Sequence, residues 1–305
     1  MTYKISVIIP SYNRRKTINR AIDSVLSQRI GSELLVECLV IDDASEDGTS
    51  EAVEEKYGEQ VVILRNSRNR EKSYSRNKGA EAAKGKLVCF LDSDDTLKPN
   101  SLTRSIEPYN SGFDGVVFAA SQRPGETEQA TLKSFSEFMD NPLTVDHYLS
   151  NPKMLCNNSF VLPKEKFISI GGYDQRLTNL EDRQLIVKML SQYSVRCLKH
   201  IICEIFRSTN SARKEYKNII EQYPGFFDSL IEGGFNLLPH QLAEIKNIED
   251  RECLSARYHN KDWAGYIMLY KQLLNCTQYQ YIPTKRDKKR QIIAYIKRNL
   301  SRVVV

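Results

Sequence analysis

The stretch that decides the fold is Val88-Cys89-Phe90-Leu91-Asp92-Ser93-Asp94-Asp95. Its first half is an apolar run with β-branched and aromatic members, which predicts a buried strand. Its second half places three carboxylates within four positions. These carboxylates repel one another, so we expect a divalent cation or a cationic partner to neutralise them. Because open α/β sheets bind ligands beyond the carboxyl ends of their strands, the stretch indicates a ligand site.

Residues 92–95 allow two other interpretations. Asp and Ser are turn residues and Pro99 follows soon, so the strand could lead into a polar turn without further function. On the residues alone this alternative stays open. A calcium loop that starts at Asp92 would require Gly at its sixth position, where Leu97 stands, and that interpretation fails.

The composition of the chain is that of a globular protein. Its 305 residues, 41% of them hydrophobic, predict one large domain with an accessory one, or two domains. No apolar run reaches the roughly 18 residues that span a bilayer, and the N-terminus leads straight into a strand without a signal-peptide pattern. We therefore expect a cytoplasmic protein.

The charge is modest but unevenly distributed. The formal net charge is +6, and basic residues concentrate at 65–86 and 285–302, which predicts anionic partners. No nucleic-acid partner is expected. The seven Cys do not show framework or CxxC spacing, and those in strand-like apolar runs should be reduced and buried: Cys38, Cys89, Cys197 and Cys203. The four His are scattered without an HxxxH pair, so no zinc site is expected.

The first third of the chain predicts a β-α-β unit. Residues 5–10 form an apolar run closed by Pro10, and residues 18–26 carry apolar side chains at helical spacing. Residues 34–41 are nearly all apolar, as in a parallel strand covered on both faces. Further strands are expected at 61–64, 115–120 and 158–162, helices at 164–170 and 179–190, and packed helices from about 215 onward.

A second acidic turn, residues 42–49, follows the strand at 34–41. Asp43, Ser45, Asp47, Gly48 and Glu54 stand at positions 1, 3, 5, 6 and 12 of an EF-hand-like pattern. That motif requires a helix before the loop, and residues 34–41 have no helical period. The calcium interpretation is therefore disfavoured.

The basic run at 65–79 leads through a short helix into the acidic strand end. Such a run is often only a solvated face. Because it directly precedes residues 88–95, its cations and the carboxylates could instead converge on one cleft, as a diphosphate beside a metal requires. Residues 122–150 are polar, with breaks at Pro124 and Pro142, and are expected to form an insertion or lid.

Six segments together resemble glycosyltransferase family 2, in order and spacing. The resemblance covers about residues 3–210 and implies the GT-A fold, a Rossmann-like α/β fold with a mixed, mostly parallel sheet flanked by helices. It implies a domain at 1–212, with a nucleotide-sugar half at about 1–121 and an acceptor half at about 122–212, and leaves 213–305 as a helical C-terminal extension. The six segments are residues 7–13, 40–49, 75–79, 90–95, 171–174 and 181–182.

The resemblance assigns roles on the donor side. Asp43 would bind the nucleotide base, while Asp42 is structural at the strand end. Arg76 would reach the base or the diphosphate. Asp92 would face the ribose and Asp94, with Asp95, would hold Mn²⁺ or Mg²⁺ against the diphosphate. Four residues complete the donor-binding set: Pro10, Tyr12, Arg14 and Ser93.

On the acceptor side the resemblance makes Asp182 the general base. It would take the proton of the acceptor hydroxyl while this oxygen attacks the anomeric carbon from the face opposite the diphosphate, with inversion. Glu181 and Arg207 are candidates for contact with the acceptor or phosphate. The simpler interpretation of Glu181 and Asp182 is that acidic residues suit a helix N-terminus. The pattern departs from the family at Thr209, where a His metal ligand commonly stands.

The function implied is transfer of one sugar from a nucleotide-diphosphate sugar, with UDP the commonest donor nucleotide. The acceptor would be a hydroxyl of a glycan or a lipid-linked acceptor, in synthesis of a bacterial-type surface polysaccharide. No QxxRW-like element for processive synthesis is present. The alternatives are a nucleotidyltransferase, which would want a Gly-rich phosphate loop after the first strand, and a non-catalytic nucleotide-sugar-binding protein. A dinucleotide oxidoreductase is excluded because no GxGxxG follows a strand.

The C-terminal segment 285–302 carries eight cations against one acid, with apolar residues on one helical face. This predicts an amphipathic helix that binds an anionic membrane surface and keeps the protein peripheral on the inner face of the membrane. Docking of the same face on the protein itself is the alternative.

Overall fold

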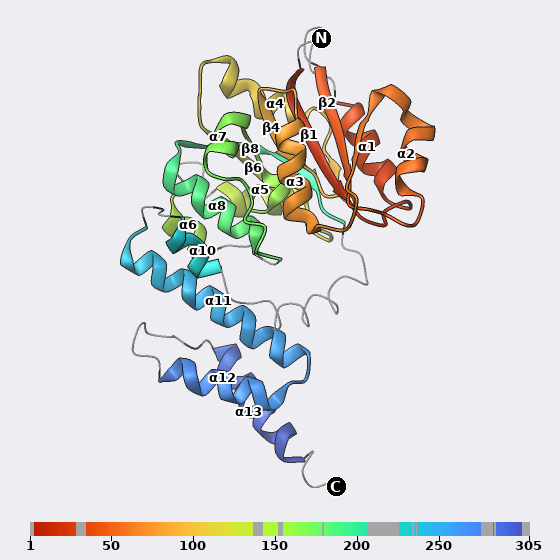
Figure 1. Ribbon diagram of the computed structural model, residues 1–305. Coiled ribbons are helices and arrows are strands. Elements are labelled where there is room, and N and C mark those ends of the chain that lie inside the picture. The colour runs from red at the N-terminus through yellow and green to blue at the C-terminus, as the bar shows by residue number, and fades with distance from the viewer. Residues whose placement is uncertain are drawn as a thin grey trace. The chain divides into compact units, whose positions relative to one another are not determined.

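The computed structural model describes residues 3–28, 35–136, 143–151, 155–178, 180–206, 226–233, 235, 237–275, 283 and 285–300. The chain forms two compact units. The first holds Met1–Arg176 and Leu180–Ser208, and the second holds Leu177–Asn179 and Thr209–Val305 (Figure 1). The domain boundary predicted at residue 212 lies outside the described residues and stays a prediction.

The described part of the first unit contains one eight-stranded sheet in the order β3-β2-β1-β4-β7-β6-β8-β5. Neighbours among β1 to β4 pair in parallel, as do β6 and β8, whereas β7 is antiparallel to β4 and β6, and β5 is antiparallel to β8. The predicted mixed α/β sheet is thereby confirmed. The strands are β1 (Tyr3–Ser11), β2 (Leu35–Asp42), β3 (Val62–Arg65), β4 (Leu87–Phe90), β5 (Thr96–Leu97), β6 (Val116–Gln122), β7 (Phe160–Pro163) and β8 (Val195–Glu204).

Helices flank this sheet, as the apolar spacing predicts (Figure 1). The apolar residues of α1 are buried in the core that β1, β2 and β4 build, so hydrophobic burial fixes α1 on the sheet. The helices are α1 (Ile18–Leu26), α2 (Thr49–Tyr57), α3 (Glu71–Ala82), α4 (Ser101–Asn110), α5 (Glu128–Ser136), α6 (Val145–Ser150), α7 (Lys164–Ser169) and α8 (Glu181–Gln192), with short 3₁₀ turns at Gly58–Gln60 and Asn157–Ser159.

Helix α3 packs closely on β1 and β2, and a glycine makes this approach achievable. A Cβ atom at Gly79 would stand 2.5 Å from Ile8 Cγ2 and 3.0 Å from Ile41 Cγ1, both on the sheet. Any larger side chain would push the helix away from the strands. This glycine therefore sets the depth at which the preceding turns of α3, including Arg76, enter the molecule.

Residues 122–150 differ from the expected insertion or lid. In its described part, α5 packs against β6 and β8, and five apolar side chains are buried: Phe135, Leu143, Val145, Tyr148 and Leu149. The polar average of the segment conceals these buried positions, which belong to the fold. Helix α4 was not predicted either, because Pro108 inside it reads as a helix breaker.

The second unit is helical in its described part, as predicted. It holds α10 (Phe226–Glu232), α11 (Pro239–His259), α12 (Trp263–Leu274) and α13 (Lys285–Leu300). Helices α11 and α13 both pack against α12 around Leu254, Tyr266, Tyr270 and Ala294. The aromatic stretch at 263–266 thus serves helix packing.

Two expectations from composition can be compared with the described residues. Their cysteines are all free, and of the four named above Cys38, Cys89 and Cys203 are buried while Cys197 is half-buried. None of the described helices is both long enough and apolar enough to cross a membrane.

Candidate functional site

The carboxyl ends of three parallel strands bring the predicted site residues to one edge of the sheet. Strand β1 lies between β2 and β4, and Ser11 at its end pairs with Asp42 at the end of β2. The backbone N–H of Asp43 donates to Ser11 O at 2.7 Å, and Leu91 N donates to Ile8 O at 3.0 Å. The turns that follow these strands therefore start side by side.

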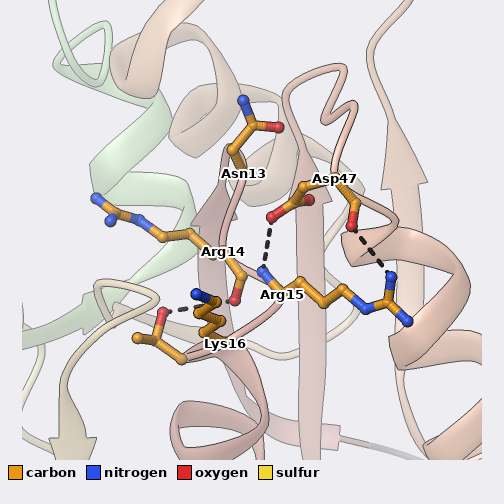
Figure 2. A pocket seen from close by; sticks show the side chains of 6 residues that line it. Asn13, Arg14, Arg15, Lys16 and Asp47 are labelled. Carbon is orange, nitrogen blue, oxygen red and sulfur yellow. Dashed lines mark hydrogen bonds between the residues drawn. The ribbon is translucent and has the colours of Figure 1, made fainter.

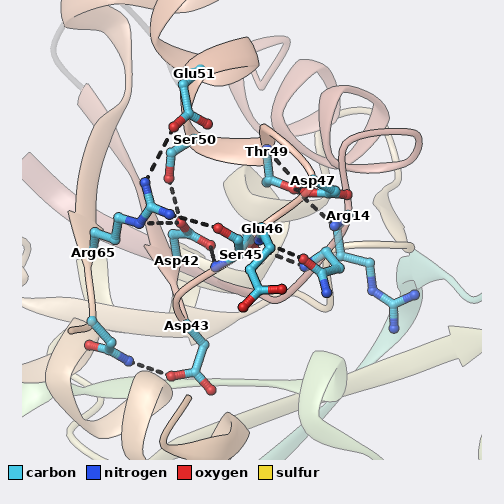
Figure 3. A network of polar contacts seen from close by, with 12 residues as sticks. Arg14, Asp42, Asp43, Ser45, Glu46, Asp47, Thr49, Ser50, Glu51 and Arg65 are labelled. Atoms are coloured by element: carbon cyan, nitrogen blue, oxygen red, sulfur yellow. Dashed lines mark hydrogen bonds and ion pairs between the residues drawn. The ribbon is translucent and has the colours of Figure 1, made fainter. Parts of the chain in front are cut away.

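The acidic turn at 42–49 is held by hydrogen bonds from its own neighbourhood (Figure 3). Buried Asp42 accepts hydrogen bonds from Ser45 N at 3.1 Å and from Ser50 Oγ at 2.5 Å, and Arg65 Nε lies 3.4 Å from it. Asp47 accepts from the backbone N–H and the hydroxyl of Thr49 and from Arg15 N, and these hydrogen bonds lower its pKa against the opposing effect of burial. The structure thus gives Asp42 the structural position that was expected.

Asp43 has different surroundings from Asp42, although both are buried. Its Oδ1 accepts hydrogen bonds from Asn66 Nδ2 at 2.6 Å and from Arg70 N at 2.9 Å. Both donors precede or open α3, so Asp43 ties the turn after β2 to the basic segment after β3. Figure 3 shows the carboxylate of Asp43 turned away from Asp42 and its partners.

The loop after β1 carries the other expected donor-side residues. Pro10 lies within β1 beside Ile41, and Tyr12 is 45% exposed. A pocket of about 400 Å³ opens beside this loop (Figure 2), lined by Asn13, Arg14, Arg15, Lys16, Thr17 and Asp47. None of residues 92–95 lines it, so this pocket is not the centre of the site.

Asp92 and Asp94 in the turn after β4 face cations that come from distant parts of the chain. Asp92 Oδ1 accepts a hydrogen bond from Arg76 Nη2 at 2.7 Å, and the Asp92 side chain is 37% exposed. Arg14 Nη2 lies 3.8 Å from Asp94 Oδ2, and Arg20 donates to the Asp94 backbone carbonyl. Burial raises the pKa of Asp94, Arg14 opposes this shift, and the charge of Asp92 adds to it.

Asp95 is buried, and protein groups occupy both of its oxygens. Asn158 Nδ2 donates to Oδ2 at 2.5 Å and Phe206 N donates to Oδ1 at 2.8 Å. Burial, followed by the charge of Asp92, raises the pKa of Asp95 to about 7. Ser93 is buried as well. These contacts anchor the turn and leave Asp92 and Asp94 as its more exposed carboxylates.

Helix α8 brings Glu181 and Asp182 to the same neighbourhood. Arg76 Nη1 lies 3.1 Å from Glu181 Oε1, and Lys72 Nζ lies 2.7 Å from the same oxygen. Glu181 is fully buried, and although burial opposes it, the charges of Lys72 and Arg76 lower its pKa. Asp182 is half-buried, and burial, then the charge of Glu181, raises its pKa. A carboxylate with a raised pKa is a stronger base, which suits proton abstraction.

The residues present fit a divalent cation only if a ligand completes its coordination. Among the described residues no group of three or more His, Cys, Asp or Glu side chains converges on one point. Asp92 and Asp94 alone supply carboxylate oxygens at an exposed turn. Mg²⁺ is commonly held by one or two carboxylates together with substrate phosphates, so this donor set fits a metal-diphosphate site.

Most predicted site residues meet in this region, and several neighbours were not predicted. The structure joins Arg76, Asp92 and Glu181 in one contact chain and Arg14 with Asp94. Arg207 lies outside the described residues. The side chains not predicted are Arg20, Asn66, Lys72, Asn158 and Asn157, the last of which lies beside Arg76. The basic run at 65–79 was a signal for Asn66 and Lys72, whereas nothing local marks the other three.

Comparison with known proteins gives a consistent family. The sequence model described as glycosyl transferase family 2 matches residues 6–171, more than half of the chain. A putative teichuronic acid biosynthesis glycosyltransferase of Bacillus subtilis is 39% identical over 105 residues, 34% of this chain and 40% of that protein. A UDP-Glc:alpha-D-GlcNAc-diphosphoundecaprenol beta-1,3-glucosyltransferase of Escherichia coli is 38% identical over 104 residues, again 34% and 40%.

The fold has solved counterparts. The mannosyltransferase PcManGT from Pyrobaculum calidifontis, in complex with GDP-Man and Mn²⁺, superposes with a TM-score of 0.64 at 16% identity, covering 97% of this chain and 87% of that one. At this identity the likeness shows the GT-A fold alone. The chain spans less than two thirds of the length of the first curated relatives that it matches.

Proposed function

Because the chain belongs to glycosyl transferase family 2, we propose that it moves one sugar from a nucleotide-diphosphate sugar to a hydroxyl of an acceptor, with inversion at the anomeric carbon. One observation carries the proposal. A single guanidinium, that of Arg76, contacts both Asp92 at the donor turn and Glu181, the neighbour of the proposed base Asp182. Residues 105 positions apart in sequence thus build one site.

The donor nucleotide would bind along the edge formed by the turns after β1, β2 and β4. Asp43, fixed by Asn66 and Arg70 N, would accept hydrogen bonds from the base, and Pro10 and Tyr12 would line the same pocket. Asp92 and Ser93 would face the ribose. Arg14, with its side chain 38% exposed and beside Asp94, is the cation placed to meet a diphosphate. UDP is the nucleotide we favour, in keeping with the E. coli relative's UDP-Glc donor.

The metal we expect is Mn²⁺ or Mg²⁺, held by Asp94 beside the diphosphate. Mn²⁺ accompanies GDP-Man in the Pyrobaculum structure. When bound, such an ion offsets the charge that builds on the departing nucleoside diphosphate. The contacts of Asp95 with Asn158 and Phe206 make it the anchor of the turn, and a direct metal contact by Asp95 stays a prediction.

In the proposed reaction Asp182 takes the proton of the acceptor hydroxyl. The acceptor oxygen attacks the anomeric carbon, the bond from that carbon to the diphosphate oxygen breaks, and the nucleoside diphosphate leaves. Attack from the face opposite the leaving group inverts the configuration. The raised pKa of Asp182 strengthens it as a base, and general-base catalysis of this kind contributes roughly 10²–10⁴-fold.

The acceptor we propose is a glycan or lipid-linked saccharide of a bacterial-type surface polysaccharide. The names of the Bacillus and Escherichia relatives, which act in teichuronic acid biosynthesis and on a diphosphoundecaprenol-linked sugar, support this class. Transfer to a synthetic lipid-diphosphate sugar, compared with the same sugar without lipid, tests it.

Attraction of α13 to anionic lipid would suit such an acceptor. Asp287, Arg290 and Ala294 of α13 are buried, whereas Arg286, Lys288 and Lys289 are exposed. The described part of α13 thus docks one face within its own unit, so we propose that membrane attraction is electrostatic, about 1 kcal/mol per exposed cation. Co-sedimentation with anionic vesicles that is lost at high salt tests it, with neutral vesicles as the control.

The function itself is tested by incubating the protein with UDP- and GDP-sugars and Mn²⁺, and by measuring release of nucleoside diphosphate. We expect release from at least one donor, abolished by EDTA. Release of pyrophosphate from a nucleoside triphosphate and a sugar phosphate would instead indicate a nucleotidyltransferase. Binding of nucleotide sugars without any turnover, with every acceptor class present, would indicate a non-catalytic binding protein.

A further inference from the structure

Two buried ionic residues join the donor turn to the helix that carries the proposed base. Arg76 of α3 contacts Asp92 through Nη2 at 2.7 Å and Glu181 of α8 through Nη1 at 3.1 Å. Lys72, one turn before Arg76 on α3, contacts the same Oε1 of Glu181 at 2.7 Å. The order of the chain of contacts is therefore Lys72, Glu181, Arg76, Asp92.

We propose that Glu181 and Lys72 are positioning residues of the donor site: they fix the Arg76 guanidinium, and through it the carboxylate of Asp92, so that donor binding depends on the residue next to the base. This inference rests on the proposed function. It gives Arg76 a role inside the protein in place of direct contact with the diphosphate, and it gives Glu181 a role other than acceptor binding.

Burial supports this assignment. The side chains of Arg76 and Glu181 are each 2% exposed, so neither offers surface to a substrate, whereas the Asp92 side chain is 37% exposed. The two ends of the chain of contacts, Lys72 at 43% and Asp92 at 37%, are the exposed ones, and of these two Asp92 belongs to the donor turn. The charges of Lys72 and Arg76 are matched by those of Glu181 and Asp92, as a buried ionic cluster requires.

The remaining surroundings of Arg76 hold its plane in place. Its guanidinium carbon lies 5.1 Å from the centre of the Tyr173 ring. The Asn157 amide satisfies its hydrogen bonds when its oxygen points at Arg76. In this orientation the oxygen accepts from Arg76 Nη1 at 3.1 Å and from Arg76 Nη2 at 2.5 Å. The Nε atom of Arg76 is buried and has no hydrogen-bond partner among the described residues. The orientation of the Arg76 guanidinium therefore depends on the contacts of its two Nη groups.

The backbone adopts a strained conformation next to two of these residues. Helix α3 begins at Glu71, whose φ is +70°, and α8 is preceded by Leu180, whose φ is +62°. Residues other than Gly rarely adopt this left-handed conformation, because it crowds the Cβ atom against the backbone. Lys72 follows Glu71 directly and Glu181 follows Leu180 directly, so both strained residues stand next to members of the ionic chain.

Loss of the Glu181 charge should therefore change the position of the Asp92 carboxylate. In Glu181→Gln the guanidinium of Arg76 would keep Asp92 as its only carboxylate within ion-pair distance among the described residues, and Lys72 would lose its anchor. Arg76 would then draw the Asp92 carboxylate inward, away from the donor. Members of one ionic network are commonly coupled in double-mutant cycles, and we expect a roughly tenfold effect on the donor affinity.

The test is a double-mutant cycle on the affinity for UDP or GDP, whichever the protein binds, in the presence of Mn²⁺. We expect Glu181→Gln to raise the Kd about tenfold in the otherwise unchanged protein. In the Asp92→Asn background the same substitution should raise it less than about twofold, because the ion pair between Arg76 and Asp92 is then already lost. An unchanged or lower Kd in Glu181→Gln, or additive effects of the two substitutions, would overturn the proposal.

One further variant, with two controls, keeps the test decisive if Glu181→Gln does not fold. Lys72→Met removes the exposed end of the chain of contacts and should raise the Kd by about two- to fivefold. Glu81→Gln and Lys84→Met, at exposed positions in and just after α3, are the matched controls and should bind as the original protein does. An unchanged Kd in Lys72→Met contradicts the proposal. Absence of UDP and GDP binding by the unsubstituted protein would instead refute the proposed function, and the inference with it.

Discussion

The two acidic turns at the edge of the sheet, residues 42–49 after β2 and residues 92–95 after β4, have similar compositions and different partners. In the first, Asp42 and Asp47 accept hydrogen bonds from Ser45, Thr49 and Ser50 of their own turn and helix. In the second, the partners of Asp92, Asp94 and Asp95 lie far away in sequence: Arg14, Arg76, Asn158 and Phe206.

This difference shows where function can reside. Carboxylates that close their own turn serve folding: Asp47 accepts from the Thr49 N–H at the start of α2, and Asp42 accepts from Ser45 N and Ser50 Oγ. Carboxylates that gather distant cations form a site only in the folded chain, and an anionic ligand with a metal can compete for those cations. We therefore expect substitutions of Asp42 and Asp47 in the first turn to affect stability and substitutions of Asp92 and Asp94 in the second to affect activity.

The largest effect is expected for Asp94→Asn. Loss of the proposed metal ligand should lower sugar transfer by about 10³-fold, as for other groups that offset charge in the transition state. Stability should not fall, because the substitution removes repulsion between Asp94 and Asp92. Turnover with Mn²⁺ and the melting temperature measure the two parts. Full activity in this variant would contradict the claim that the second acidic turn serves activity.

Asp42→Ala should have the opposite profile. It removes a buried acceptor of hydrogen bonds from Ser45 N and Ser50 Oγ and leaves Arg65 with Glu51 as its remaining carboxylate partner. The free energy of unfolding should fall by about 2–3 kcal/mol, the usual cost of leaving buried polar groups unpaired. Urea denaturation measures it, with Asp94→Ala as the control, for which we expect a change below about 0.5 kcal/mol.

A carboxylate outside both turns, Asp182, sharpens the comparison. For Asp182→Asn we expect kcat to fall by about 10² or more, while Mn²⁺-dependent UDP binding stays as before, because only the proposed base is lost. Single-turnover kinetics and titration calorimetry separate the two. Normal turnover would transfer the base role to another group, and failure to fold would favour the helix-terminus interpretation of this residue.

The pH dependence gives a smaller effect with a definite sign. A general base acts only when deprotonated, so activity is lost as the pH falls through its pKa. Since burial and Glu181 raise the pKa of Asp182, the acid limb of kcat should lie at a higher pH than for an ordinary aspartate. A pH profile of kcat measures it. An acid limb at or below the usual aspartate range would speak against Asp182 as the base.

Much of the sheet could be predicted from the sequence because its elements follow local rules. The apolar runs of β1 and β2 and the spacing of Ile18, Ala21 and Ile22 are visible without any partner. Helix α4 was hidden by Pro108, and α5 and α6 by a polar average. In both cases burial against β6 and β8 or within the unit overrides the local signal.

The candidate site was predictable in its residues but not in its contacts. Residues 92–95, Arg76 and Asp182 stand in sequence segments that resemble the family. No sequence rule says that Arg76 is buried between Asp92 and Glu181, because that arrangement depends on how closely α3 approaches the sheet at Gly79 and on where α8 begins. Asn158, which holds Asp95, carries no local signal at all.

The most direct test of the comparison is Mn²⁺ binding in the presence of UDP, measured by electron paramagnetic resonance on a matched pair of substitutions. Asp94→Asn and Asp47→Asn remove the same charge from the second and the first acidic turn. We predict that Asp47→Asn binds Mn²⁺ as the unsubstituted protein does and that Asp94→Asn loses at least about tenfold in affinity. Unchanged Mn²⁺ affinity in Asp94→Asn, or an equal loss in both variants, would contradict the assignment of the metal site to the turn after β4.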